Sequence, residues 1–304
     1  MSASPETLAG VASVDCSGIQ ALVTGSTNGI GRRTALALGR LGADVIVHGR
    51  DTRAGTALVD ELAAIGSDAT FVEADFASVA AVRDLAATVR TETDGLDLIV
   101  NNAGGLFRDG RLTELGVEYT FQVNHLAPYL LTADLLDHVR EGGRIVTTAS
   151  AAHKGVSLDL DRVQSVDRHS GMWAYSHSKL ANVLFAAELA RRLTDSDREI
   201  TSNSLHPGAI PGSGFSRFLP GPFPQLLQTL EAVPGVTSVA DGAAEILYVG
   251  VSPRTASISG QYFANQQPTV PSSSARDTVA ATRLWSESAA ALDIDEPLAD
   301  STTV

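Results

Sequence analysis

The sequence predicts an α/β fold, a doubly wound parallel sheet within a single domain. Short apolar runs of five or six residues alternate with longer helical patterns along most of the 304-residue chain. Strands buried on both faces and joined by helical crossovers are typical of parallel sheets. A glycine-rich turn also joins the first apolar run to the first helical pattern, inside a unit of about 30 residues, the size of one strand–helix–strand unit. Repetition of that unit builds a doubly wound sheet.

The expected elements follow one another in regular order. Strands are expected at residues 19–24, 44–48, 69–74, 96–101, 144–149 and 200–205. Helices are expected at about 30–41, 52–65, 78–93, 117–139 and 173–194. Later elements are a helix at about 239–250, a strand at 260–265, a loop at QQPTVPSSS and an amphipathic helix at about 275–291.

Three segments differ in composition from this pattern. Residues 1–17 form a polar leader with a helical turn after Ser4-Pro5-Glu6, and residues 292–304 form an acidic tail that we expect to fray, so the domain spans 18–291. After the sixth strand, residues 207–235 are rich in Gly, Pro, Phe and Leu. We interpret them as a substrate loop whose apolar residues cover a hydrophobic substrate; a contact between subunits or plain core is the alternative.

Composition excludes several classes of protein. A hydrophobic fraction of 44% excludes a mainly disordered chain. Cys16 is the single cysteine, so no intrachain disulfide or multi-cysteine metal site can form, and no metal is expected. The first residues lack the pattern of a secretory signal, and no run of about 18 apolar residues occurs. We therefore expect a soluble, cytoplasmic protein without a membrane anchor.

The charge of the chain is strongly negative. Thirty-five acidic residues against 22 basic ones give a net charge of -13, which disfavours nucleic acid and anionic membranes as partners. Among the basic residues, 20 are Arg and only Lys154 and Lys179 are Lys. An acidic surface poor in lysine is expected of a halophilic protein, because salt screens the repulsion. A GC-rich genome, which favours Arg codons, is the alternative explanation.

The turn TGSTNGIG, residues 24–31, lies between the first strand and the first helix. Its glycines at 25, 29 and 31 allow a tight turn and a close approach of backbone to a pyrophosphate. The following helix N-terminus offers free N–H groups to the phosphates. The turn therefore predicts a dinucleotide site, although a glycine-rich turn that binds nothing has the same sequence.

Arg50 indicates which dinucleotide is bound. An NAD site places an acid at the end of the second strand, where this chain has Gly49 followed by Arg50. A guanidinium suits a 2′-phosphate because its donors are forked and its charge is permanent, so we predict NADP(H). If Arg50 is only a solvated surface residue, NAD(H) would serve. Asp51 is expected as the N-cap of the next helix.

Two further groups follow predicted strands. Asp75 comes after the third strand and NNAGG, residues 101–105, after the fourth. Ligands of open α/β sheets bind at the carboxyl ends of the strands, and the small Ala103-Gly104 pair would let backbone approach a cofactor. Either group could alternatively be an ordinary turn.

The helix that begins near residue 173 carries the pair with the most specific chemistry. Tyr175 and Lys179 are four residues apart and therefore share one helix face. A tyrosine with a pKa near 10 is a poor base at neutral pH, but a nearby ammonium and an oxidised nicotinamide would both stabilise its phenolate. A lysine in a chain that otherwise avoids lysine favours function over a surface pair without a role.

Two more polar residues are candidates for the same chemistry. Ser150 ends the strand at 144–149 and could donate a hydrogen bond to a carbonyl or alkoxide oxygen, or could simply cap a turn. Asn124 lies in a helix four residues before Pro128, whose ring would free the carbonyl of residue 124 to bind water. An ordinary kinked helix is the alternative there.

Together these motifs resemble the classical short-chain dehydrogenase/reductase family, which has a Rossmann fold. They are T-G-x3-G-I-G at 24–31, Asp75, N-N-A-G at 101–104, Asn124, Ser150, Tyr175-x3-Lys179 and Pro207-Gly208, in the family's order over about residues 18–265. The segments VNHLAPYLLT, AYSHSKLANVLFAAELARRL and LHPG are similar to its retinol-dehydrogenase-like subgroup.

The resemblance implies a role for each matched residue. Tyr175 is the general acid/base, Lys179 lowers its pKa and holds the nicotinamide ribose, Ser150 orients the substrate oxygen and Asn124 anchors a relay water. Asp75 would contact adenine. The residues implied to bind the cofactor are Gly25, Thr27, Asn28, Gly29, Ile30, Gly31, Arg50, Asp75, Phe76, Asn102, Ala103, Gly104, Tyr175, Lys179, Pro207 and Gly208.

Two departures from the family pattern are visible. The Thr that usually follows Pro-Gly and binds the carboxamide is replaced at the aligned position by Gly212, where Ser213 could substitute. Many retinol-type members carry an N-terminal anchor, whereas this chain begins with a polar leader. Relatives often pair through the helices that carry Asn124 and Tyr175, which makes a homo-oligomer possible.

The predicted function is an NADP(H)-dependent oxidoreductase that interconverts an alcohol and a carbonyl, with a hydrophobic aldehyde or ketone as substrate. The alternative is a non-catalytic NADP(H)-sensing protein on the same fold, although such proteins typically lack the Tyr/Lys pair. An epimerase or dehydratase of nucleotide sugars would have a differently spaced glycine motif and a larger substrate domain.

Overall fold

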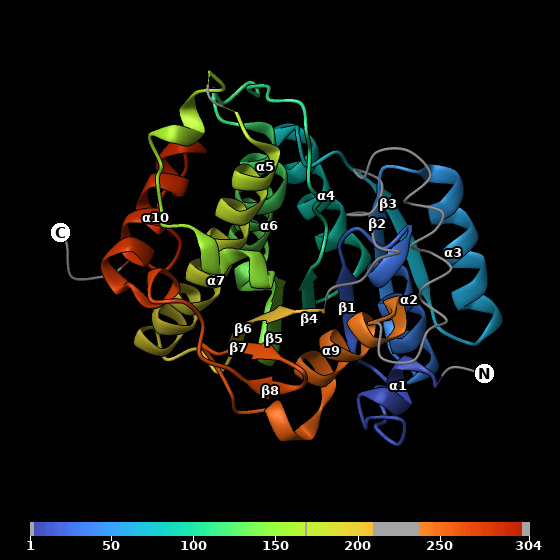
Figure 1. The fold of residues 1–304 in the computed structure, drawn as a ribbon. Helices are drawn as coiled ribbons and strands as arrows, with labels where there is room; N and C mark the ends of the chain where they lie inside the picture. Colours follow the sequence, from blue (N-terminus) through green and yellow to red (C-terminus); the bar gives the residue numbers. More distant parts are fainter. Residues whose placement is uncertain (1–2, 168, 209–236, 300–304) are drawn as a thin grey trace.

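The computed structural model describes residues 3–167, 169–208 and 237–299. Its centre is an eight-stranded sheet of order β3-β2-β1-β4-β5-β6-β7-β8 (Figure 1). All neighbouring strands are parallel except β7 and β8. The strands are β1 (Gln20–Val23), β2 (Asp44–Gly49), β3 (Ala69–Glu73), β4 (Leu96–Asn101), β5 (Val139–Thr148), β6 (Thr201–His206), β7 (Tyr262–Ala264) and β8 (Gln267–Pro268). The predicted doubly wound, single-domain Rossmann fold is confirmed.

Alternate residues of each central strand face opposite helix layers, as expected for a sheet buried on both sides. Leu22 of β1 packs into one core, whereas Ala21 and Val23 pack into the other. One layer contains α1 (Pro5–Leu8), α2 (Gly29–Arg40), α3 (Thr52–Ala64) and α9 (Val239–Val251). The other contains α4 (Val79–Glu92), α5 (Tyr119–Phe121), α6 (Ala127–Leu135), α7 (Gly171–Asp195) and α10 (Thr278–Ala291).

The helix expected at 117–139 is interrupted. It consists of α5, a π-helical segment at Gln122–Leu126, α6 and a short 3-10 turn at Leu136–His138. Pro128 has no N–H to donate to the carbonyl four residues earlier, which favours a change in hydrogen-bond pattern at this point. Asn124 therefore lies in the π-helical segment, and β5 begins at Val139, earlier than the predicted strand.

The described parts of the N-terminal segment, residues 3–17, and of the C-terminal segment, residues 292–299, pack more closely than predicted. In the segment expected as a polar leader, Val11 is fully buried, and Glu6 is buried beside Arg40 of α2. Ser4 caps the predicted helical turn. In the tail, Leu292 is buried, and Arg192 of α7 binds the carboxylate of Glu296 at 3.1 Å. Apolar residues spaced among the polar ones explain why these two segments pack against the domain.

The helix α10 packs along α7 (Figure 1) and also contacts α6. The Tyr129 hydroxyl of α6 donates to the Trp285 carbonyl at 3.1 Å, and the Phe185 ring of α7 stacks on Trp285 at 5.8 Å. The two helices expected to pair with a second copy are thus both in contact with α10 of the same chain. The predicted substrate loop lies largely outside the described residues, as do Gly212 and Ser213.

Candidate active site

The predicted site residues gather at one edge of the sheet, because the carboxyl ends of six parallel strands meet there. Each strand from β1 to β6 is followed within two residues by a member of the predicted set. In order they are Gly25, Arg50, Asp75, Asn102, Ser150 and Pro207.

The turn after β1 requires glycine for packing inside the protein. Gly25 has φ +65°, and a Cβ there would lie 2.8 Å from the Ala103 Cα. A Cβ on Gly31 would lie 2.4 Å from the Gly25 carbonyl oxygen. The Thr24 hydroxyl accepts hydrogen bonds from the N–H groups of Asn102 and Ala103, both at 3.0 Å. The glycine turn and the NNAG segment therefore form one unit.

The N-terminus of α2 differs from those of most other helices. Side chains cap α3, α4, α7, α9 and α10, whereas the N-cap residue of α2, Asn28, makes no side-chain cap. A Cβ on Gly29, the first helical residue, would meet no atom of the described residues within 4 Å. Open space beside uncapped helical N–H groups suits a phosphate. Asn28 is exposed, Thr27 lies against Gly49, and Ile30 packs on the core below.

Arg50 and Asp75 lie at the exposed side of this edge. The Arg50 guanidinium approaches the Asp75 carboxylate at 3.7 Å, and their side chains are 60% and 48% exposed. Both remain accessible to a ligand at the ends of β2 and β3. The side chain of Asp51 accepts from the Ala54 N–H and caps α3, as predicted.

Phe76 points into the core of the protein. It is only 3% exposed, and its ring stacks on His48 of β2 with centroids 4.5 Å apart. Its ring therefore packs in the core and does not face a ligand, and the role of Phe76 in cofactor binding stays a prediction. His48, which the motif analysis did not assign to the site, was detectable as a histidine that ends an otherwise apolar strand.

Asn124 is completely buried, and its amide joins three segments. Its Oδ1 accepts from the Gly105 N–H at 2.9 Å, and its Nδ2 donates to the Gly105 carbonyl and to the Ser178 hydroxyl, each at 2.9 Å. A Cβ on Gly104 would lie 2.6 Å from this Oδ1. Asn124 thus fixes the NNAGG segment against α7.

Ser150 and Tyr175 meet at the end of β5. Their side chains are hydrogen-bonded to each other, and the Ser150 hydroxyl also accepts from the Ala152 N–H at 3.2 Å. Tyr175 lies on the first turns of α7, whose N-terminus is capped by Ser170. Two hydroxyls held together in this way can bind one substrate oxygen.

Lys179 lies one turn after Tyr175 and is buried, with 4% exposure. Its Nζ donates to the Thr148 carbonyl at 2.9 Å and lies 5.7 Å from the centroid of the Tyr175 ring. Asn182, on the same helix face, donates to the same carbonyl at 3.2 Å. Asn182 and Ser178 were not predicted, although their spacing from Lys179 and Tyr175 on one helix could have indicated them.

The electrostatics of the protein chain keep Tyr175 protonated. Burial raises the pKa of Tyr175, and the hydrogen bond from Ser150 opposes that rise. Burial also lowers the pKa of Lys179 to about 8. The lowered tyrosine pKa expected for this pair depended on two cations, Lys179 and an oxidised nicotinamide, and the chain's own groups give the opposite direction.

Pro207 and Gly208 follow β6 as predicted, and they border a cavity of about 430 Å³ with Asp241 and Glu245 of α9. Among the described residues, no three His, Cys, Asp or Glu side chains converge as metal ligands do. Nor does that part of the chain contain a helix with the length and apolarity needed to cross a bilayer.

Comparison with known proteins identifies the family of this arrangement. Residues 20–217 match the family model described as short chain dehydrogenase. The chain is 35% identical to human retinol dehydrogenase 13 over 291 residues, which cover 91% of this chain and 85% of the relative.

Solved structures agree with this match. A short chain dehydrogenase from Burkholderia cenocepacia in complex with NADP superposes with a TM-score of 0.67 at 30% identity, covering 86% of this chain and 98% of that one. The landomycin C-6 ketoreductase LanV with bound NADP and rabelomycin superposes with a TM-score of 0.64 at 27% identity, covering 83% and 96%.

Proposed function

We propose, on the premise that the chain belongs to the short-chain dehydrogenase/reductase family, that it is an NADP(H)-dependent oxidoreductase. It interconverts a hydrophobic alcohol and the corresponding aldehyde or ketone. The observation that carries this proposal is the hydrogen-bonded Ser150–Tyr175 pair beside the buried Lys179 ammonium. These three groups provide a hydroxyl donor, an acid and a fixed positive charge at the edge where sheets of this type bind ligands.

The residues around the glycine turn fit a dinucleotide phosphate. The open space at Gly29 and the uncapped N-terminus of α2 would receive the pyrophosphate. Arg50 is exposed at the end of β2 and would bind a 2′-phosphate with its forked donors. Asp75, whose carboxylate lies near the Arg50 guanidinium, would contact the adenine. NADP in the similar Burkholderia and landomycin enzymes supports this choice.

The catalytic step follows from the hydroxyl pair. When bound, the reduced nicotinamide supplies a hydride to the carbonyl carbon. Ser150 donates a hydrogen bond to the substrate oxygen, and Tyr175 transfers its proton to that oxygen as negative charge develops there. A protonated Tyr175, which the protein chain favours, is the form needed for reduction. The reverse reaction requires the phenolate.

Lys179 and Asn124 support this pair. The Lys179 ammonium, fixed on the Thr148 carbonyl, would hold the nicotinamide ribose and favour the phenolate once a second positive charge is near. Asn124 would hold the relay water. Its side chain binds Gly105 and Ser178, so any contact with water would come from its main chain.

Substrate, location and surface are proposed on more general grounds. The names of the similar proteins, a retinol dehydrogenase and a landomycin C-6 ketoreductase, support a hydrophobic substrate. A cytoplasmic location is supported by the single, buried Cys16. The net charge of -13 and the scarcity of lysine support adaptation to high salt.

The first test is a fluorescence titration of the wild type and Arg50→Ala with NADPH and NADH. We expect the wild type to bind NADPH at least tenfold more tightly, about 1.4 kcal/mol, and the variant to lose that preference. Equal binding of the two cofactors by the wild type would move the assignment to NAD(H). Absence of binding would contradict the proposed function.

The second test is turnover of a panel of hydrophobic ketones and aldehydes by the wild type and Tyr175→Phe. The variant should bind NADPH with nearly wild-type affinity and should lose turnover by about a thousandfold, because the proton donor is gone. A variant that retains most of the activity would show that Tyr175 is not the acid. Tight NADPH binding without turnover of any carbonyl would favour a cofactor-sensing protein.

A further inference from the structure

His48 connects three strand ends through its ring. It lies at the end of β2 and is 2% exposed. Its Nδ1 lies 3.2 Å from the backbone nitrogen of Gly25, in the turn after β1. Its Nε2 lies 3.1 Å from the carbonyl oxygen of Ala74, just after β3. One buried ring therefore links the glycine turn to the segment that carries Asp75.

The partners determine the protonation of the ring. A backbone N–H can only donate, so Nδ1 accepts from Gly25 and carries no proton. A carbonyl can only accept, so Nε2 carries the proton and donates to Ala74. Burial lowers the pKa of His48 to about 4, with smaller effects from Arg50 and Asp75. The ring is therefore neutral at physiological pH, as both hydrogen bonds require.

The same residue holds its two neighbours in other ways. The His48 carbonyl accepts from the Ser26 N–H at 2.9 Å, and the His48 N–H donates to the Ser26 hydroxyl at 3.0 Å. The ring stacks on Phe76 with an interplanar angle of 19°. The turn at Gly25-Ser26 and the segment at Ala74–Phe76 thus both rest on His48.

We propose that His48 is a positioning residue for the dinucleotide. Its ring holds the turn that receives the pyrophosphate at a fixed place relative to the segment that receives the adenine. His48 itself contacts neither group. This inference rests on the proposed NADP(H) function. It extends that function by naming the residue that couples the two parts of the cofactor site.

The two hydrogen bonds can be separated by substitution. His48→Gln can place an N–H near the position of Nε2 and keep the bond to Ala74, but it has no acceptor near the position of Nδ1. His48→Asn can place its oxygen near the position of Nδ1 and keep the bond from Gly25, but it loses the Ala74 bond and the ring. The first variant releases the turn, and the second releases the adenine segment.

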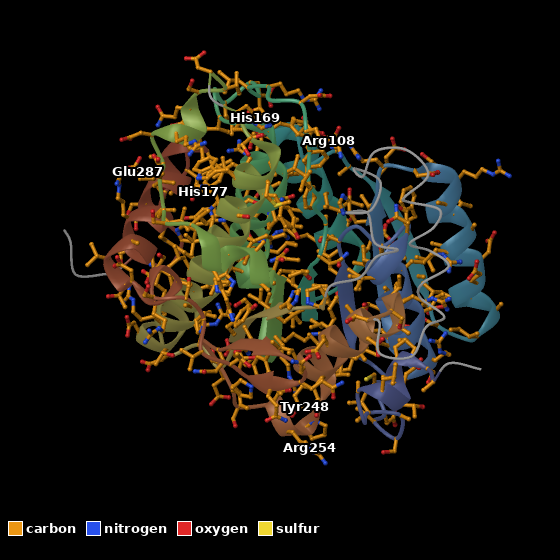
Figure 2. The ribbon with its side chains drawn as sticks, in the orientation of Figure 1. Arg108, His169, His177, Tyr248, Arg254 and Glu287 are labelled. Atoms are coloured by element: carbon orange, nitrogen blue, oxygen red, sulfur yellow. The ribbon has the colours of Figure 1, made fainter. Side chains whose placement is uncertain are left out.

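His177 provides the matched control. It is also fully buried, its ring Nε2 accepts a backbone N–H, that of Asp159 at 2.9 Å, and burial also lowers its pKa to about 4. It lies on α7, in the half of the molecule that carries α7 and α10 (Figure 2). His177→Asn removes a similar buried bond away from the glycine turn.

The experiment compares NADPH with adenosine 2′-monophosphate, which lacks the pyrophosphate. The measured quantity is the affinity for NADPH divided by the affinity for adenosine 2′-monophosphate. Both affinities are obtained by titration and competition, using only variants that unfold cooperatively and are therefore folded. We expect His48→Gln to lower this ratio about tenfold, because only the pyrophosphate part is affected. His48→Asn should weaken both ligands together and leave the ratio within threefold. His177→Asn should leave both affinities within twofold.

The outcomes separate the inference from the function on which it rests. An unchanged ratio in His48→Gln, or an equal change in both His48 variants, overturns the inference alone. A wild type that binds neither ligand overturns the proposed function and the inference with it. If a variant fails to fold, ¹⁵N NMR of the wild-type ring decides: between pH 6 and 8 Nδ1 must be unprotonated and Nε2 protonated, and any other state overturns the inference.

Discussion

The two halves of the sheet edge hold their functional groups in different ways. In the half formed by β1, β2 and β3, the side chains of Arg50 and Asp75 are exposed, and their charged groups make only a loose contact of 3.7 Å. In the half formed by β4, β5 and α7, Asn124 and Lys179 are buried, and each is bonded to other parts of the chain. Exposed charges form most of their favourable interactions only when a ligand binds, whereas buried groups are already oriented before the ligand binds. We therefore expect the first half to determine the affinity for the cofactor and the second to determine the rate of turnover.

The largest effect is expected in the buried half. Lys179→Met keeps most of the length of the side chain but removes its charge and its donor to Thr148. Turnover should fall by roughly a hundredfold or more, the usual range for loss of acid–base assistance. The Kd for NADPH should rise by less than tenfold. Steady-state kinetics and NADPH titration measure these two effects. A variant that loses affinity for NADPH but keeps its kcat would contradict the assignment of rate to the buried half.

Gly104→Ala tests how tightly the buried half is packed. The new Cβ would lie 2.6 Å from the Asn124 Oδ1, at a φ of +153°. We expect the free energy of unfolding to fall by about 3 kcal/mol, from backbone strain and overpacking together, and kcat to fall with it. Chemical denaturation measures the first effect.

Gly142→Ala is the control for strain without a clash. Gly142 has φ +80°, and a Cβ there would have no neighbour within 4 Å in the part of the chain that the structure describes. This variant should lose about 1 kcal/mol from strain alone and keep its kcat. Equal losses in the two glycine variants would mean that Asn124 does not fix the segment.

The stability of the buried half should depend on pH. The pKa of Lys179 is about 8 in the folded chain and near 10.5 in the unfolded chain. Between these values the unfolded chain binds more protons, so the contribution of Lys179 to stability increases as the pH rises. The wild type should gain about 2 kcal/mol relative to Lys179→Met between pH 7.5 and 9.5. A constant difference between the two proteins would contradict the burial of a charged lysine.

The smallest effect is expected from salt. Salt should change the cofactor affinity assigned to the exposed half but not the turnover assigned to the buried half. Raising KCl from 0.1 to 1 M should weaken NADPH binding by about threefold, because salt screens the exposed Arg50, and should leave kcat nearly unchanged. The same salt should raise the melting temperature, since the net charge is -13. A melting temperature that is independent of salt would favour GC-rich coding as the reason for the scarcity of lysine.

Much of the candidate site was predictable from the sequence because its motifs are local. The glycine turn, NNAG, Ser150 and the Tyr175/Lys179 pair each depend on residues adjacent in sequence or on one helical turn, and parallel strands bring their ends together. Arg50 and Asp75 were predicted for the same reason. The parallel, doubly wound sheet was predictable from the apolar runs and the helical patterns between them, whereas the order of the strands was not predicted.

The remaining features depend on contacts between distant segments. Nothing near Phe76 shows that its ring packs inward on His48 rather than toward a ligand. The antiparallel β8 arises in a segment that reads as a loop, through Phe263 and Pro268. The π-helical segment at Asn124 interrupts a continuous helical pattern, and only the proline indicated a change there.

The covering of α7 by α10 has a consequence for how the protein is made. The helix that bears Tyr175 and the strands β1 to β8 are synthesised before α10 and the segment around Glu296. Until then, the aromatic face of α6 and α7 that receives Trp285 lacks its cover. Domains fold from the N-terminus during synthesis, and exposed apolar surface in an incomplete chain promotes aggregation. The α10 helix therefore acts late in biogenesis, and a premature stop before it would expose this face in every copy produced.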